Sequence, residues 1–152
     1  MRSLLLMLIM MLSYPLFSQN LRSGGKLKPE QAIMDIRHYT LVLEVDPEQK
    51  TINGSTEIDL ILSQSSSLLL LDLWNGLTVK QVLVNGKPEN FTHLDDLIRI
   101  TNSSLWSAGK IKIKVFYGGT PSVAIRPPWT GGFQWEKDGM GNPWIAITCQ
   151  GE

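Results

Sequence analysis

Residues 38–62 constrain the fold more than any other part of this chain. Apolar side chains recur at every second position of residues 38–46, with only Val42 out of place, and the alternation resumes over residues 52–62. The apolar positions are Tyr39, Leu41, Leu43, Val45, Ile52, Ile58, Leu60 and Leu62. A period of two indicates an extended strand with one buried face. Residues 46–50 interrupt the pattern with Pro47 and charged neighbours, which favour a turn. The stretch therefore predicts an antiparallel hairpin whose apolar face needs a second layer to cover it.

The length and composition bound what the chain can build. The 152 residues suffice for one domain with a real core and are too few for a second large domain. A hydrophobic content of 43% excludes a disordered chain, and a formal charge of zero argues against a nucleic-acid-binding surface. The single cysteine, Cys149, excludes an internal disulfide framework and a zinc site built from several cysteines.

Residues 1–18 have the three parts of a secretory signal peptide. Arg2 supplies a positive start, residues 4–12 are an unbroken apolar run, and Ser18 is a small residue before Gln19. The run is about half as long as the roughly 20 residues that a membrane span requires. We expect cleavage after Ser18 and a secreted or periplasmic product with no remaining membrane span. An uncleaved anchor is the alternative.

Residues 19–34 are predicted to be a lead-in segment, with a helical turn at residues 30–34, and residues 35–152 are predicted to be the β domain. Beyond the hairpin, the apolar run at residues 68–71 predicts a strand buried on both faces, which would sit centrally in a sheet. Residues 77–84 predict another strand, and Asn85-Gly86 predicts a tight turn at its end.

The later part of the chain adds further strands at residues 97–100, 109–117 and 144–149. Lys110, Lys112 and Lys114 alternate with apolar residues, which indicates a solvated outer face or a protected sheet edge rather than an anion-binding stripe. About seven strands, no amphipathic helix and loops rich in glycine and proline predict an all-β fold, an antiparallel β-sandwich.

Catalytic chemistry has no candidate in these residues. His38 and His93 are the only imidazoles, and neither stands in the helical H-E-x-x-H pattern that binds zinc. No Gly-x-Ser-x-Gly sequence is present, and no strong base stands beside Cys149. We therefore predict no catalytic residue and no metal ligand in this chain.

Tryptophans gather near the end of the chain, and two interpretations of them remain open. Trp129, Trp135 and Trp144 could fill the core of the sandwich. Exposed, they could instead stack on sugar rings or bind a peptide, since an aromatic face offers apolar area without requiring hydrogen bonds.

Two stretches resemble a known family. The first comprises residues 35–47 and 50–56, in the opening hairpin. The second comprises Arg126-Pro127-Pro128-Trp129-Thr130-Gly131-Gly132-Phe133, Asn142-Pro143-Trp144 and Thr148-Cys149-Gln150-Gly151-Glu152. They resemble the beginning and the end of the amino-terminal domain of zinc aminopeptidases of the aminopeptidase N and leukotriene-hydrolase type, in their secreted bacterial members. The family often has an acidic residue where this chain has Thr130.

The resemblance implies a saddle-like β-sandwich that packs on a thermolysin-like zinc domain. It implies that Gln150 helps hold the free amino group of a peptide substrate, because an amide oxygen accepts hydrogen bonds from an ammonium. Glu152 is a nearby carboxylate that would add charge complementarity. The alternative is that both residues are simply the end of a truncated strand.

The zinc-binding helix of this family would lie beyond Glu152. We therefore expect zinc in a missing catalytic domain and none in this chain, which should be inactive alone. The expected role is the non-catalytic amino-terminal domain of a secreted zinc metallo-aminopeptidase, with its own catalytic domain and peptide substrates as partners and no nucleic acid. The rival is a stand-alone secreted β-sandwich module that binds glycan or peptide through exposed tryptophans.

Overall fold

A computed structural model of the protein describes residues 27–148. The predicted signal peptide, part of the lead-in segment, and Cys149, Gln150 and Glu152 lie outside the described residues. A short helix, α2 (Pro29–Ala32), comes first and corresponds to the helical turn expected at residues 30–34. Strands make up most of the rest: β1 (Met34–Asp46), β2 (Thr51–Leu62), β3 (Ser66–Asp72), β4 (Leu77–Val84), β5 (Lys87–Pro88), β6 (Asn90–Leu94), β7 (Leu97–Trp106), β8 (Gly109–Gly119), β9 (Gly132–Lys137) and β10 (Pro143–Thr148).

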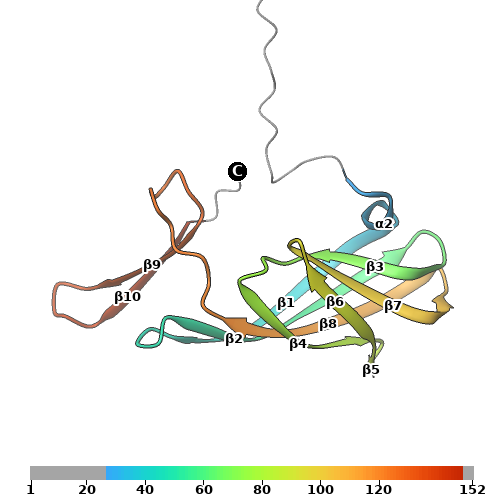
Figure 1. Ribbon diagram of the computed structural model, residues 1–152, viewed down its shortest axis with the longest axis horizontal. Coiled ribbons are helices and arrows are strands. Elements are labelled where there is room, and N and C mark those ends of the chain that lie inside the picture. The colour runs from blue at the N-terminus through green and yellow to red at the C-terminus, as the bar shows by residue number, and fades with distance from the viewer. Residues whose placement is uncertain (1–26, 149–152) are drawn as a thin grey trace, which may run out of the picture.

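The strands form two facing sheets and a separate hairpin (Figure 1). The larger sheet has five strands in the order β1-β2-β8-β4-β5, and the smaller has three in the order β3-β7-β6. β9 and β10 form the hairpin, and every pairing between named strands is antiparallel. This arrangement confirms the predicted all-β antiparallel fold.

One hydrophobic core fills the space between the two sheets. Its most deeply buried members come from β3, β4, β7 and β8 and are fully enclosed: Leu69, Val82, Ile100 and Ile113, each 0% exposed. Each fully buried aliphatic side chain stabilises the fold by about 1.5–3 kcal/mol relative to its exposed state.

The hairpin predicted at residues 38–62 is confirmed as β1 and β2. Tyr39 lies opposite Ile58, and Val45 lies opposite Ile52, so the alternating apolar residues share one face. The turn between the strands is closed by Asp46, whose Oδ1 accepts hydrogen bonds from the backbone N–H of Glu48 and Gln49 at 2.9 Å each. An aspartate that binds its own following backbone is a common way to start a turn.

The apolar face of this hairpin is covered only in part. Ile52 and Ile58 of β2 are each 5% exposed, whereas Tyr39 and Leu41 of β1 are 52% and 59% exposed. The expectation that a second layer covers the whole face is therefore wrong for β1. The reason is the unequal width of the layers: three strands cannot cover five, and β1 is the edge strand.

Two further expectations about strand positions are resolved by the topology. The strand at residues 68–71 is β3, which lies at the edge of the smaller sheet, so the prediction of a central position is wrong. Burial on both faces is correct, because the neighbours Leu69 and Leu70 are 0% and 4% exposed. The pattern of apolar residues in a strand indicates which of its faces are covered. It does not indicate how many strands pair with it.

The lysine face is solvated, as predicted, but it is not an edge. β8 lies between β2 and β4, and Lys110 and Lys112 are exposed on it. Lys112 donates to Glu57 and lies 3.2 Å from Asp59, so neighbouring carboxylates on β2 neutralise it. The hydrogen bond to Glu57 is the main reason that the pKa of Lys112 is raised above its ordinary value. These contacts explain Lys112 without an anionic ligand.

Gly54 is required by the close approach of β1 and β2. Its φ is +156°, and a Cβ added there would lie 1.9 Å from the carbonyl oxygen of Val42. We expect Gly54→Ala to lower the free energy of unfolding by about 2 kcal/mol or more, because the two strands must separate to admit the methyl group. Urea denaturation followed by circular dichroism measures the change.

Gly139→Ala is the matched control, because a Cβ at Gly139 would meet no atom within 4 Å. It should change the free energy of unfolding by less than about 0.5 kcal/mol. Equal stability of the two variants would contradict the account of the β1–β2 contact.

Candidate functional site

The two site residues expected from the sequence, Gln150 and Glu152, lie outside the described residues, so the structure neither joins nor separates them. It does describe the strand that leads to them, β10, which ends at Thr148. The described residues that come closest to them in the sequence belong to the β9–β10 hairpin.

Phe133 connects this hairpin to the sandwich. Its backbone N–H donates to the carbonyl oxygen of Ser122 at 2.8 Å, and its carbonyl oxygen accepts from the N–H of Ala124 at 3.0 Å. Its ring packs against the hydrophobic core and stacks on Trp135, with 5.1 Å between ring centroids. β9 was missed in the sequence, although five of its six residues pair with residues of the predicted last strand.

The register separates the two faces of the hairpin. Phe133 lies opposite Ile147, and Trp135 lies opposite Ile145, which makes one apolar face. Trp144 lies opposite Glu136 on the other face, where Gln134 Nε2 also donates to Thr148 Oγ1 at 3.3 Å. Residues 144–148 thus form the strand predicted there, and its side chains alternate between two faces.

The structure tests the two interpretations of the tryptophans left open by the sequence. Trp135 is half-buried, and its Nε1 is enclosed without a hydrogen-bond partner among the described residues. Trp129 and Trp144 are 69% and 53% exposed. An exposed aromatic surface is therefore correct for Trp129 and Trp144, whereas Trp135 is half-buried against Phe133 on the hairpin and is not a member of the sandwich core.

The loop that carries Trp129 is closed by its own residues. The backbone N–H of Arg126 donates to Thr130 Oγ1 at 2.7 Å, and the N–H of Trp129 and of Thr130 donate to the carbonyl oxygen of Arg126 at 2.8 and 3.0 Å. The hydroxyl of Thr130 thus fixes the loop and holds Trp129 at the surface.

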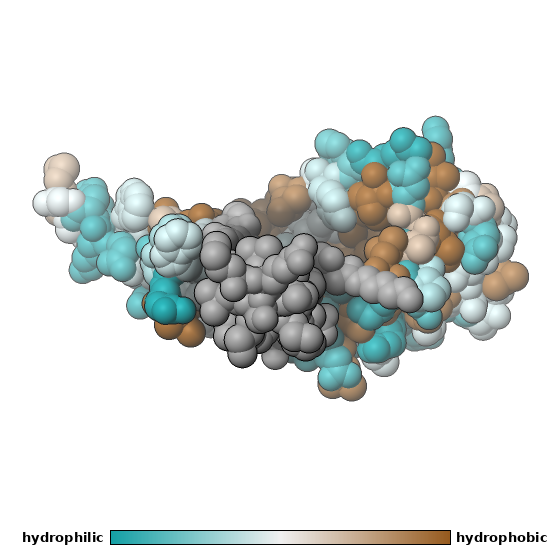
Figure 2. Space-filling model, turned by 90° about the horizontal axis from the view of Figure 1, so that it is seen from above, coloured by the Kyte–Doolittle hydropathy of each residue, from teal (hydrophilic) through white to brown (hydrophobic). Residues whose placement is uncertain are grey.

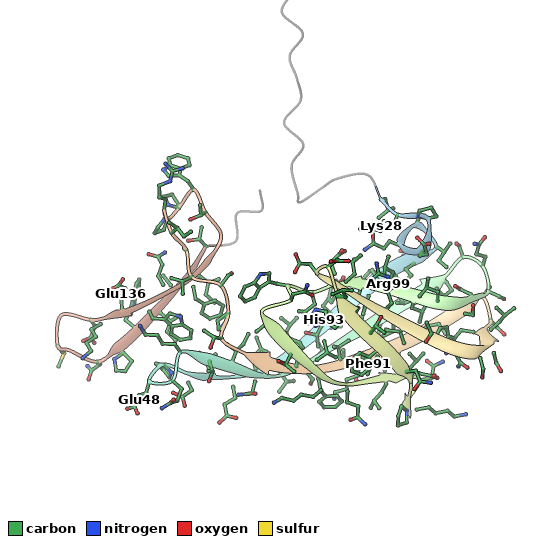
Figure 3. The ribbon with its side chains drawn as sticks, in the orientation of Figure 1. Lys28, Glu48, Phe91, His93, Arg99 and Glu136 are labelled. Atoms are coloured by element: carbon green, nitrogen blue, oxygen red, sulfur yellow. The ribbon has the colours of Figure 1, made fainter. Side chains whose placement is uncertain are left out.

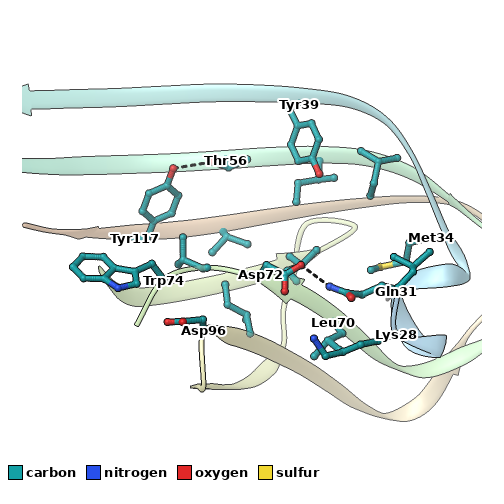
Figure 4. Close-up of a pocket in the computed structure, with 17 residues that line it drawn as sticks. Lys28, Gln31, Met34, Tyr39, Thr56, Leu70, Asp72, Trp74, Asp96 and Tyr117 are labelled. Carbon is teal, nitrogen blue, oxygen red and sulfur yellow. Dashed lines mark hydrogen bonds between the residues drawn. The ribbon is translucent and has the colours of Figure 1, made fainter. Parts of the chain in front are cut away.

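A groove lies between the two sheets, where the inner face of β1 is left uncovered (Figure 4). This groove has a volume of about 920 Å³. Its floor is apolar and includes Ile58, Ile98 and Val115, and α2 borders it through a hydrogen bond of 2.6 Å from Gln31 Nε2 to Asp72 Oδ2. Tyr117 and Thr56 are joined at its wall through their hydroxyl oxygens at 3.0 Å. The groove can enclose apolar groups.

The described residues do not fit a zinc ion. Among residues 27–148, no group of three histidine, cysteine or acidic side chains comes close enough to hold a metal. His93 Nε2 lies 2.8 Å from the carbonyl oxygen of Leu73, and His38 is exposed on β1. Figure 3 shows His93 in the sandwich and Glu136 far from it on the hairpin.

No helix within the described range is long and apolar enough to span a membrane.

Asp138 organises the tip of the hairpin. Its carboxylate accepts hydrogen bonds from the backbone N–H of Met140 and of Asn142 at 2.9 and 2.8 Å, and from Asn142 Nδ2 at 3.0 Å. The side-chain bond from Asn142 is the main reason that the pKa of Asp138 is lowered from its ordinary 3.8. The ionised carboxylate therefore holds the loop above pH 3.8, and this support is lost as the pH falls through the lowered pKa.

Asn142→Ala should raise the pKa of Asp138 towards its ordinary value, because it removes the largest stabilising contact of the carboxylate. Titration of the side-chain carboxyl signal by nuclear magnetic resonance measures the shift. Asn90→Ala, an exposed asparagine on β6, is the control and should leave the pKa of Asp138 unchanged. The same pKa in both variants would contradict the role of Asn142.

Comparisons with known proteins were made for sequence and for structure. No protein-family model matches the sequence, and no curated protein matches it. Solved structures do match. A variant of a two-domain M1 zinc metallopeptidase bound to L-arginine has a TM-score of 0.57 and 22% identity, over 71% of this chain and 25% of that one.

Two further structures agree. An M1 zinc metallopeptidase from Deinococcus radiodurans has a TM-score of 0.55 and 22% identity, over 70% of this chain and 27% of that one. Yeast LTA4 hydrolase in complex with bestatin has a TM-score of 0.58 and 20% identity, over 86% of this chain and 20% of that one. The chain thus has the fold of one part of these enzymes and spans about a quarter of their length or less, which confirms the fold expected from the resemblance.

Proposed function

We propose that this chain is the non-catalytic amino-terminal β domain of a secreted zinc metallo-aminopeptidase. In this role it packs on a catalytic domain and contributes to binding the amino terminus of a peptide substrate. The observation that carries the proposal is the fold shared with one part of the M1 zinc metallopeptidases and LTA4 hydrolase. The sequence supports it independently through the resemblance at both ends of the domain.

A supporting role agrees with the chemistry of the described residues. Peptide hydrolysis in a zinc peptidase needs a metal-activated water, and no cluster among residues 27–148 suits the metal. The zinc would be held by the catalytic domain, and this chain would supply one wall of the cleft.

The hairpin end supplies a surface for packing. Trp129, Trp144 and Ile147 are all more than half exposed, with Trp144 and Ile147 on opposite faces of the hairpin, and exposed large apolar groups often mark a protein interface. β10 leads from this surface directly to Gln150. An interface here would place the expected substrate-binding residues close to the catalytic domain that they serve.

Gln150 and Glu152 remain the proposed substrate-binding residues. The Gln150 amide oxygen would accept a hydrogen bond from the substrate ammonium, and the Glu152 carboxylate would complement its charge. Such a contact measures the distance from the first residue of the peptide to the scissile bond, so it favours cleavage of the terminal residue.

The longer product of the reading frame beyond Glu152 should contain an H-E-x-x-H sequence, bind zinc and hydrolyse aminoacyl-p-nitroanilides, whereas this chain alone should not. In that product, Gln150→Ala should lower kcat/KM at least tenfold, about 1.4 kcal/mol, because the ammonium loses a charge-assisted hydrogen bond. Zinc content and steady-state kinetics measure both.

Gln134→Ala is the control for the kinetic effect, since Gln134 is a half-buried amide on β9 that bonds to Thr148. It should leave kcat/KM within about twofold. Absence of the zinc sequence would overturn the enzyme assignment. An active zinc enzyme that is insensitive to Gln150→Ala would overturn only the residue assignment.

The exposure of Trp129 and Trp144 favours a second candidate, a secreted module that binds glycan or peptide by stacking. In that case the purified chain should change its tryptophan fluorescence when titrated with oligosaccharides, and Trp129→Ala should abolish the change. Leu105→Ala, another exposed apolar residue, is the control. No response at millimolar ligand would exclude glycan binding through these residues.

A further inference from the structure

β1 carries a long run of exposed residues. Every residue from 37 to 45 is exposed, and the run includes Tyr39, Leu41, Val42, Leu43 and Val45, which are 38–61% exposed. Figure 2 shows hydrophobic residues scattered among hydrophilic ones on the visible face of the sandwich, which is ordinary for a protein surface. The apolar residues at positions 39, 41, 43 and 45 are different, because they share one face of the strand and form a single surface.

Among residues 27–148, the same strand is an open sheet edge. β1 pairs with β2 on one side and ends the order of the five-stranded sheet on the other. Every second residue therefore points its N–H and C=O away from β2. Proteins usually protect such an edge with proline, lysine or a bulge. Residues 39–45 contain no proline or lysine, and the one register shift, between Ile36 and His38, lies before them.

We propose that this edge pairs with the β1 edge of a second copy of the chain. The two strands would run antiparallel about a two-fold axis normal to the sheet, so that two five-stranded sheets become one continuous sheet. A two-fold axis of this kind keeps the inner face of one copy next to the inner face of the other. The partner is thus fixed as an identical strand rather than an unrelated one.

The register follows from the exposed run itself. Leu41 is the midpoint of residues 37–45, so pairing the whole run with its copy puts Leu41 opposite the same residue. Tyr39 then lies opposite Leu43, on the inner face that is apolar in both copies. Cross-strand aromatic–aliphatic pairs of this kind stabilise a sheet.

The charges fit the same register. His38 lies opposite Glu44 of the second copy, twice by symmetry, and Arg37 lies opposite Val45. Like charges directly opposite each other, which destabilise a pair of strands, do not occur within the run. In this register no like charges meet, and the apolar residues at positions 39, 41 and 43 of the inner face meet one another, so the edge is compatible with a copy of itself.

The first test is the mass of the purified chain in solution. Light scattering after size exclusion should show a dimer, and Leu41→Lys should raise the dimer dissociation constant at least tenfold, because two lysines meet at the axis. Leu105→Lys makes the same change at a 67% exposed leucine on β7 and should leave the dimer intact. A monomeric unchanged chain, or a dimer that survives Leu41→Lys, would overturn the proposal.

The second test is the register. In a Cys149→Ser background, Leu41→Cys should form a disulfide with its own copy under mild oxidation, since opposite Cα atoms lie about 4.5–5.5 Å apart. Leu43→Cys should not, because the two Leu43 positions would be about 14 Å apart. Cross-linking through Leu43 and not Leu41 would contradict the register. Neither outcome bears on the zinc-aminopeptidase proposal, which rests on the fold and on Gln150.

Discussion

The packing of a narrow sheet on a wider one determines the rest of this structure. Leu69 and Ile100 from the smaller sheet meet Val82 and Ile113 from the larger one with no contact with water. Since three strands lie over five, β1 extends past the cover. The groove, the exposed face of β1 and the open sheet edge all follow from this difference in the number of strands. The proposed pairing of β1 with a second copy would give the open edge a partner strand.

The hairpin end is held by other contacts. Phe133 joins it to the sandwich through backbone hydrogen bonds and through its ring, which packs against the core. Its local contacts, such as those of Asp138 at the tip and Thr130 in the preceding loop, are made within a few residues of sequence. A hairpin built in this way can present Trp129 and Trp144 without drawing them into the core. It thereby supports the proposed role of this end in binding a second domain and a substrate.

Local periodicity was sufficient to predict β1, β2, β4 and β8, and Asn85-Gly86 predicted its turn, with φ of 50° and 80°. Neighbour relations were not predictable, as the edge position of β3 shows, because an apolar run reports burial of both faces and not the number of paired neighbours. β9 was missed because its aromatic residues look like loop residues when glycine pairs surround them. The turn at Asp95 and Asp96 was missed too, since aspartates adopt its positive φ of 54° and 58° less often than Asn-Gly.

The site was predictable only through the family resemblance, because no spacing of residues indicates that an amide such as Gln150 binds an ammonium. Exposure of the tryptophans depends on distant neighbours, which is why the sequence left two interpretations.

The uncovered face of β1 also has a thermodynamic consequence. Its apolar groups contact water in the folded monomer, so unfolding hydrates less new surface there, and the heat capacity should rise less per residue than in a closed sandwich of equal length.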